Sequence, residues 1–99
     1  MNAATPPLIV SDVRYTPAST ADAARGLLGF VTCTLNGALR LDGLTLRRSL
    51  AGDLVLSYPT RKDRAGKLHA YYRPVDAAAR LAIEAQVFAA LGLQAELAA

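Results

Sequence analysis

The sequence of residues 27–46 is LLGFVTCTLNGALRLDGLTL. Its Asn36-Gly37 pair tolerates positive φ at both residues, which is typical of a two-residue type I′ turn between antiparallel strands. We therefore expect one strand over 27–35 and a second strand that starts at Ala38. Leucines alternate with polar residues before and after Asp42-Gly43, but with opposite phase, and this slip predicts a β-bulge at that pair.

A two-residue turn also sets the register of this hairpin. The pairs that it predicts are Leu39 with Thr34, Arg40 with Cys33 and Leu41 with Thr32. Each face of the hairpin would then carry both apolar and polar residues, so we expect both faces to be partly covered. The mid-strand position of Cys33 is typical of a small buried hydrophobe rather than of a nucleophile.

Further strands are predicted on both sides of the hairpin, because β-branched and aromatic residues alternate with turn signals there. The predicted elements are a first strand over 8–15, a mobile loop over 16–24, a turn at 51–53, a fourth strand over 54–58, and a third hairpin with its tip at Ala65-Gly66 that returns through 68–72.

A C-terminal helix is predicted over 77–91. Pro74 cannot donate to a strand ladder and ends the sheet, Asp76 is placed to cap the helix, and Gly92 is placed to end it. The expected buried face consists of Leu81, Ala85, Phe88 and Leu91, widened by Ile83 and Val87.

Together, the predicted strands and helix indicate one small α+β domain with an antiparallel sheet of about five strands. The 99 residues are 53% hydrophobic, but 20 of them are Ala and 16 are Leu, so the core is thin. A single Cys33 and a single His69 supply neither a disulfide nor a four-ligand zinc site. Self-association is the remaining source of stability for so short a chain, and we expect a homodimer.

The chain divides into a disordered leader over 1–7, a folded domain over 8–92 and a C-terminal tail over 93–99. No run of about 18 residues is apolar and free of charge, and the first residues do not resemble a signal peptide. An unpaired thiol fits a reducing compartment. We therefore expect a soluble cytoplasmic protein without membrane contact.

The net charge of +3 is concentrated in one segment. Between Arg61 and Arg73 there are five basic residues and one acidic residue, Asp63, whereas the rest of the chain has six basic and seven acidic residues. Lysine and arginine beside hydroxyl groups are the composition that binds nucleic-acid phosphates. The alternative interpretation is an exposed hairpin that only keeps the protein soluble.

Catalysis is not expected. No Ser or Cys lies in a context that presents a nucleophile, His69 is better explained as a strand or phosphate-contact residue, and no pair of carboxylates has catalytic spacing. A phosphate loop and a dinucleotide-binding fingerprint are also missing from the sequence. We therefore expect no cofactor, metal or small-molecule substrate, and a small hydrolase is the weakest hypothesis.

Several short motifs occur in a defined order between Val10 and Leu91. They are VSDVR at 10–14, PTRK at 59–62, Gly66, PVD at 74–76, and Arg80, Ile83 and Val87 within the helix. In order and spacing this set resembles the bacterial SpoVG family, the stage V sporulation and septation regulators. The family commonly has I-T-D-V-R, P-S-K/R-R, a loop glycine, P-I-N and T-R-x-x-I-x-x-x-V at these places.

The resemblance implies a dimeric α+β domain that binds DNA, with RNA binding also described for the family. The family's basic loop falls on Thr60, Arg61, Lys62, Arg64 and Lys67, and Arg73 and Arg80 are second-rank contacts. Asp63-Arg64-Ala65 stands where the family commonly has Thr-Pro-Asp, and Arg73 replaces a His. These differences keep the positive charge and alter the residues that would set sequence preference.

The predicted function is a homodimeric, nucleic-acid-binding regulator that uses one basic hairpin from each protomer. A β-ribbon can enter a major groove, and two copies related by a twofold axis suit two half-sites. The alternative function is a protein-interaction module whose hairpin docks an acidic partner of the cell-division machinery.

Overall fold

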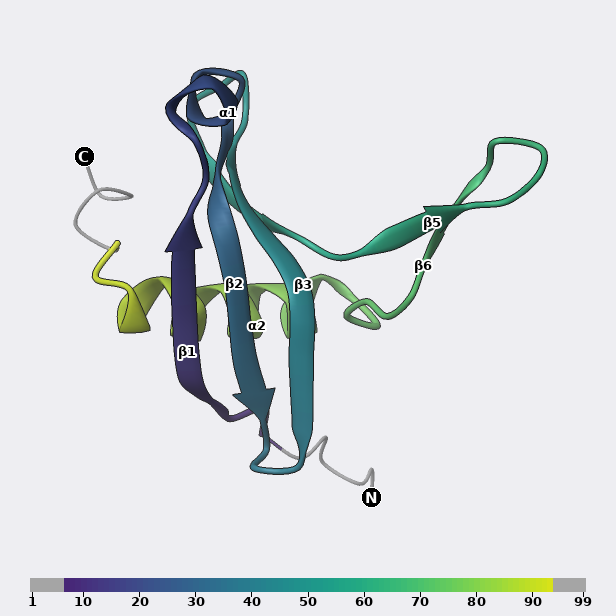
Figure 1. The fold of residues 1–99 in the computed structure, drawn as a ribbon. Coiled ribbons are helices and arrows are strands. Elements are labelled where there is room, and N and C mark those ends of the chain that lie inside the picture. Colours follow the sequence, from purple (N-terminus) through teal and green to yellow (C-terminus); the bar gives the residue numbers. More distant parts are fainter. Residues whose placement is uncertain (1–6, 94–99) are drawn as a thin grey trace.

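A computed structural model describes residues 7–93, so positions 1–6 of the predicted leader and 94–99 of the predicted tail lie outside the described residues. The elements within the described part are β1 (Val10–Pro17), α1 (Thr20–Ala24), β2 (Leu27–Leu35), β3 (Leu39–Arg48), β4 (Leu54–Ser57), β5 (Thr60–Lys62), β6 (Leu68–Ala70) and α2 (Ala77–Ala90) (Figure 1).

The strands form two antiparallel sheets. One has four strands in the order β1-β2-β3-β4, and the other consists of β5 and β6. The α+β class and the C-terminal helix are thus confirmed, whereas the single sheet of about five strands is wrong. The strand predicted over 54–58 ends at Ser57 because Pro59 has no N–H for a ladder, and the chain leaves the main sheet there.

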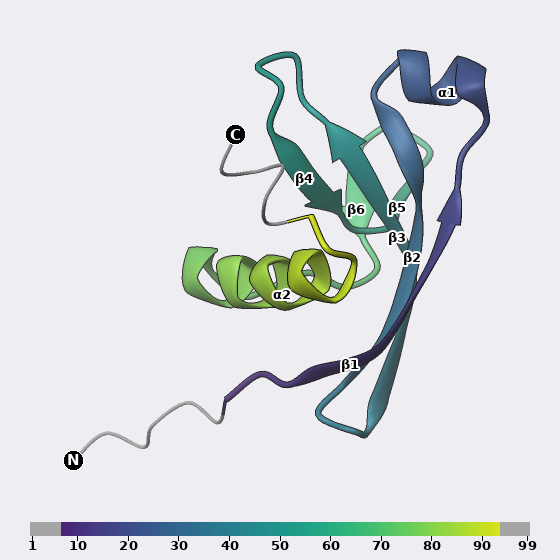
Figure 2. The same ribbon diagram turned by 90° about the vertical axis from the view of Figure 1, so that its left-hand side faces the viewer.

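Helix α2 crosses one face of the four-stranded sheet, and the β5–β6 hairpin projects away from both (Figure 1). Viewed along the sheet, α2 lies on one side and the opposite face is open (Figure 2). Among residues 7–93, no helix is long and apolar enough to cross a membrane.

The central hairpin corrects the predicted register by one residue. Leu35 pairs with Leu39, so the loop has three residues instead of two, although Asn36 and Gly37 do have the expected positive φ of 52° and 64°. Asn36 still pairs with the chain before β1, because its N–H donates to Ile9 O at 2.7 Å and its Oδ1 accepts from Ile9 N–H at 2.7 Å. Ala38 N–H donates to Leu35 O at 3.0 Å, and Leu39 is the first paired residue of β3.

The corrected register sorts the two faces of the sheet. The next pairs along the hairpin are Thr34 with Arg40 and Cys33 with Leu41. Cys33 is completely buried beside Val31, as predicted for a small hydrophobe, and the polar pair lies on the opposite face. The expectation of two mixed, partly covered faces was therefore wrong.

The predicted bulge at Asp42-Gly43 is confirmed. Cys33 pairs with Leu41 and Val31 with Leu44, so two residues of β3 oppose one residue of β2. Gly43 has a φ of 83°, which favours glycine, and a Cβ built there would lie 3.2 Å from Pro59 Cβ. The bulge thus keeps the leucines on the inner face and lets the start of the β5–β6 hairpin pack closely.

The segment predicted as a mobile loop over 16–24 contains regular structure. Its first two residues extend β1, and 20–24 form α1. Ser19 caps this helix by accepting a hydrogen bond from Asp22 N–H at 3.1 Å. Ser, Thr and Asp are cap residues as well as loop residues, and this double role explains the error.

Helix α2 begins and ends as predicted, and it buries Ile83, Val87 and Phe88 as predicted, but its buried face is turned away from Leu81 and Ala85. Asp76 accepts from Ala79 N–H at 2.8 Å, and Leu91 is the C-cap before Gly92. Leu81 is 57% exposed and Ala85 is also exposed, contrary to the prediction. The buried residues of α2 are Ile83, Glu84, Val87 and Phe88, which pack on Val31, Cys33, Leu41, Leu44, Leu46, Leu54 and Leu56.

Two polar side chains of α2 hold both edges of the main sheet. Gln86 accepts from Val10 N–H at 2.8 Å and donates to Leu8 O at 2.7 Å, on the β1 side. Glu84 accepts from Leu56 N–H at 3.1 Å, on the β4 side. These bonds satisfy edge groups that have no strand partner, and they rotate α2 so that Ile83 and Val87 face the core.

The observed orientation of α2 predicts a large loss of stability for one substitution and a small loss for another. Phe88→Ala should lower the free energy of unfolding by about 3–5 kcal/mol, because Phe88 is only 4% exposed and truncation leaves a cavity. Leu81→Ala should lower it by less than about 1 kcal/mol, because the exposed side chain loses little packing. Urea unfolding followed by circular dichroism measures both values, and equal costs would contradict this helix orientation.

Candidate nucleic-acid interface

Five of the seven predicted site residues lie on the β5–β6 hairpin, which we call the basic arm (residues 60–70). Thr60, Arg61 and Lys62 form β5, and Arg64 and Lys67 lie in the tip that joins it to β6. All five are exposed, and the arm projects from the body of the protein (Figure 1). The structure therefore brings these residues together on one element.

Cationic groups occupy both faces of the basic arm. Arg61 pairs with His69, and Lys62 pairs with Leu68. Because successive residues of a strand point to opposite faces, Arg61 and Lys62 lie on different sides of the ribbon. A ligand could thus meet positive charge on either side of the arm.

Asp63 is the acidic residue of the arm, and it organises the tip. Its Oδ1 accepts from Ala65 N–H and from Lys67 N–H, each at 2.9 Å. Its Oδ2 lies 2.7 Å from His69 Nε2, and His69 must be the donor because a carboxylate can only accept. The hydrogen bond from His69, followed by that from the Lys67 amide, holds the pKa of Asp63 below its ordinary value.

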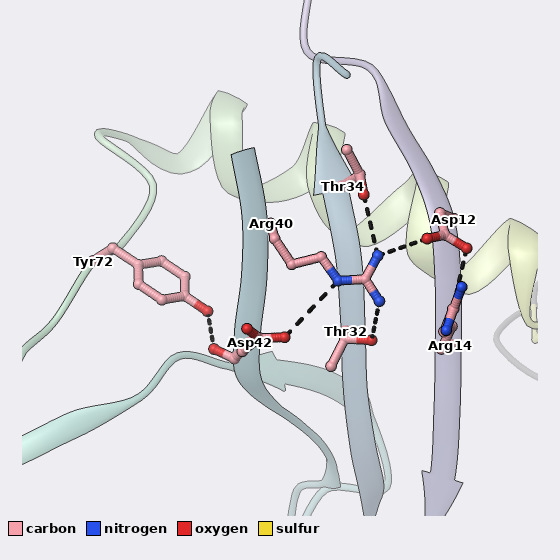
Figure 3. A network of polar contacts seen from close by, with 7 residues as sticks. All are labelled: Asp12, Arg14, Thr32, Thr34, Arg40, Asp42 and Tyr72. Atoms are coloured by element: carbon pink, nitrogen blue, oxygen red, sulfur yellow. Dashed lines mark hydrogen bonds and ion pairs between the residues drawn. The ribbon is translucent and has the colours of Figure 1, made fainter. Parts of the chain in front are cut away.

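The arm is anchored to the bulge of β3. Tyr72 donates its hydroxyl to Asp42 O, as Figure 3 shows, and Pro59 packs against Gly43. The rings of Tyr58 and Tyr72 meet edge to face, with centroids 5.9 Å apart and planes at 87°. Burial raises the pKa of both tyrosines to about 12, so both hydroxyls stay protonated at neutral pH.

Arg73 and Arg80, the second-rank candidates, do not lie on the arm. Both line a hollow at the start of α2, together with Tyr58 and Pro74. Arg80 NH1 lies 3.1 Å from Glu84 Oε1, so this arginine pairs with the buried carboxylate of the same helix. Arg73 is exposed at the root of the arm, whereas Arg80 has a structural partner.

A second polar cluster was not predicted. On the open face of the sheet, Arg40 NH1 lies 2.6 Å from Asp12 Oδ2, and Arg14 Nε lies 3.2 Å from Asp12 Oδ1 (Figure 3). Arg40 also donates to Thr32 Oγ1 at 3.1 Å and Thr34 Oγ1 at 3.2 Å. The hydrogen bonds that Asp12 accepts, from Arg40 first and then from Arg14, lower its pKa. The two threonines at alternate positions could have indicated this cluster, but the incorrect register did not place them beside Arg40.

The remaining chemistry-bearing groups are dispersed. Cys33 has no disulfide partner, and burial raises the pKa of its thiol. Within residues 7–93, no three His, Cys, Asp or Glu side chains are grouped so that they could hold a metal ion. The basic arm and the open sheet face are thus the surfaces on which polar groups gather.

No protein-family model matches the chain, and no curated protein is significantly similar to it. The resemblance to the SpoVG family rests on the sequence motifs alone. In the structure, VSDVR lies in β1, PTRK spans the root of the arm and β5, and PVD stands immediately before α2.

The Asp63 contacts predict a pH-dependent tip. Because folding lowers this pKa, the carboxylate stabilises the arm above its ordinary value of 3.8, and the stabilisation is lost as pH falls through the lower folded value. The Lys67 amide resonance should move toward its random-coil position over that range in an NMR titration. The movement should be missing in Asp63→Ala, and its persistence there would show that another group causes it.

Proposed function

We propose that this chain is a nucleic-acid-binding protein of the SpoVG type that holds phosphate groups with its basic arm. The observation that carries the proposal is the exposed arm, which has four cations and one carboxylate. That carboxylate, of Asp63, is already bonded to His69 and to two backbone amides. Within residues 7–93, the four cations make no ion pair with an acidic group. They are Arg61, Lys62, Arg64 and Lys67.

The shape of the arm supports the same ligand. A two-stranded ribbon fits the major groove of duplex DNA, which is about 12 Å wide. Arg61 and Lys62, on opposite faces, would meet the phosphates of the two groove walls, and the Thr60 hydroxyl would position them. Contacts of this kind give affinity with little sequence preference.

Dimerisation is part of the proposal. The short chain and its thin core favour self-association. Support comes from an apolar groove of about 230 Å³ between the β2–β3 hairpin and the segment before α2. Its lining includes Leu8, Leu39 and Val75. Val75 is 89% exposed, and a second copy seated on this groove would bury it.

The phosphate contacts predict a steep salt dependence. For duplex DNA, log affinity should fall with log salt at a slope near −0.9 per phosphate contacted. Arg61→Ala/Lys62→Ala removes four charges from a dimer and should flatten the slope by about 2–4 units, with the fold retained because the residues are exposed. Fluorescence anisotropy at several salt concentrations measures the slope, and circular dichroism checks the fold.

The matched control is Arg61→Lys/Lys62→Arg, which keeps both charges and should keep most of the slope. Wild-type affinity and slope for both DNA and RNA in a folded Arg61→Ala/Lys62→Ala protein would refute the nucleic-acid site. The positive charge of the arm, with exposed Leu68 and Tyr71 beside it, would then favour an acidic protein partner.

The groove predicts an obligate dimer. Sedimentation at low micromolar concentration should give twice the 10.4 kDa mass of one chain. Val75→Asp should produce monomers because it places a charge in the apolar contact, whereas Leu50→Asp, at an exposed turn outside the groove, should not. A folded wild-type monomer at that concentration would contradict the dimer.

A further inference from the structure

The open face of the main sheet carries one large aromatic side chain among polar neighbours. Phe30 follows Gly29 and precedes Val31, both buried on the α2 side, so its own side chain points to the opposite face. It is 46% exposed. Figure 2 shows that α2 covers only the other face of these strands. Nearly half of this aromatic residue is thus accessible to a ligand.

The neighbours of Phe30 follow from the register. Thr16 on β1 and Thr45 on β3 pair with it directly. Arg14 and Arg47 lie two residues from these threonines and therefore share the face. They are the diagonal neighbours of Phe30 on its two sides, at Cα distances of about 7–8 Å. The exposed ring thus lies between two hydroxyls and two guanidinium groups.

Both guanidinium groups can accept an anion. The side chain of Arg47 is exposed and makes no hydrogen bond or ion pair with the part of the chain that the structure describes. Arg14 uses its Nε for Asp12, and its side chain remains 71% exposed. Asp12 is also bonded to Arg40, so its negative charge is shared between two arginines. The positions on either side of Phe30 therefore favour negative ligand groups.

This surface is continuous with the basic arm. A cross-strand row runs from Ser57 through Thr45 and Phe30 to Thr16. Ser57 lies at the end of β4, three residues before Thr60, with which the arm begins. At about 4.8 Å per strand, Phe30 lies only about 10 Å from the start of the segment that leads into the arm. A polymer held by the arm can therefore extend onto the sheet.

We propose that the open sheet face binds single-stranded RNA, with one base stacked on Phe30 and the flanking phosphates held by Arg14 and Arg47. The ligand must be single-stranded because a duplex hides the faces of its bases, whereas an unpaired base can stack on an exposed ring. Thr16 and Thr45 offer hydroxyls to the ribose 2′-hydroxyl, which favours RNA over DNA. The inference rests on the proposed function, since the arm holds the neighbouring nucleotides.

Anisotropy with a fluorescein-labelled oligouridylate of about 12 nucleotides tests the site. Phe30→Ala should weaken its binding about 5-fold to 150-fold, the range for loss of one base stack. Phe30→Tyr, which keeps a ring, should bind within about 2-fold of the wild type. The control is Leu50→Ala, which truncates an exposed apolar side chain at the turn after β3 and should change nothing.

Three further measurements distinguish the sheet face from the arm. Duplex DNA should bind Phe30→Ala as it binds the wild type, whereas Arg61→Ala/Lys62→Ala should weaken both ligands. The matched oligodeoxyuridylate should bind the wild type less tightly than the oligouridylate. Photocrosslinking with 4-thiouridine RNA should label the tryptic peptide 26–40, which contains Phe30.

Unchanged oligouridylate affinity in folded Phe30→Ala, with reduced affinity in Arg61→Ala/Lys62→Ala, would overturn the sheet site and leave the arm in place. Unchanged affinity in both variants would overturn both proposals. Equal binding of the deoxy oligonucleotide would overturn the assignment to RNA. Conversion of a dimer into a monomer by Phe30→Ala would show that a second copy covers this face, which also overturns the proposal.

Discussion

The buried carboxylate of Glu84 fixes how helix α2 packs on the four-stranded sheet. It is 6% exposed, accepts the Leu56 amide through one oxygen and pairs with Arg80 through the other. A buried charge is tolerated only when it is paired and hydrogen-bonded, so Glu84 can occupy this place only if α2 crosses β4 in the observed orientation. Gln86 makes the corresponding bonds to the β1 edge. The helix therefore covers one face of the sheet, and the other face stays open.

The bulge at Asp42-Gly43 connects this body to the basic arm. It returns the leucines of β3 to the core, and it also provides the carbonyl and the close surface that hold Tyr72 and Pro59. The arm beyond this anchor has two short strands and exposed cations that repel one another. Asp63 offsets the repulsion because its carboxylate bonds the tip amides and His69 from within the arm. Rigidity thus lies at the root and at the tip, while the charged side chains remain free for a ligand.

The two proposed surfaces divide the work of recognition. The arm would offer charge to phosphates, which any nucleic acid carries, and would so supply affinity and salt dependence. The sheet face offers a ring and hydroxyls, which distinguish an unpaired base and a ribose. Their continuity through Ser57 and Thr45 would allow one strand of RNA to use both. Duplex DNA would use the arm alone.

Local backbone requirements were readable from the sequence. Asn36-Gly37 and Asp42-Gly43 each indicate an unusual backbone conformation within two adjacent residues, so the positions of the turn and the bulge were predicted correctly. The limits of α2 followed from Asp76 and Gly92 for the same reason. The clustering of five site residues on one hairpin was also predictable, because they are close neighbours in the chain.

Contacts between distant residues depended on how the elements meet in space. The observed hairpin register differs by one residue from the predicted one, and its pairs separate an apolar face from a polar one. Glu84 reaches a strand 28 residues away and so exposes Leu81 instead of burying it. The cluster of Asp12 and Arg40, and the exposed position of Phe30 between two arginines, follow from that register. Periodicity identifies apolar residues on an element, but only packing decides which of them face the core.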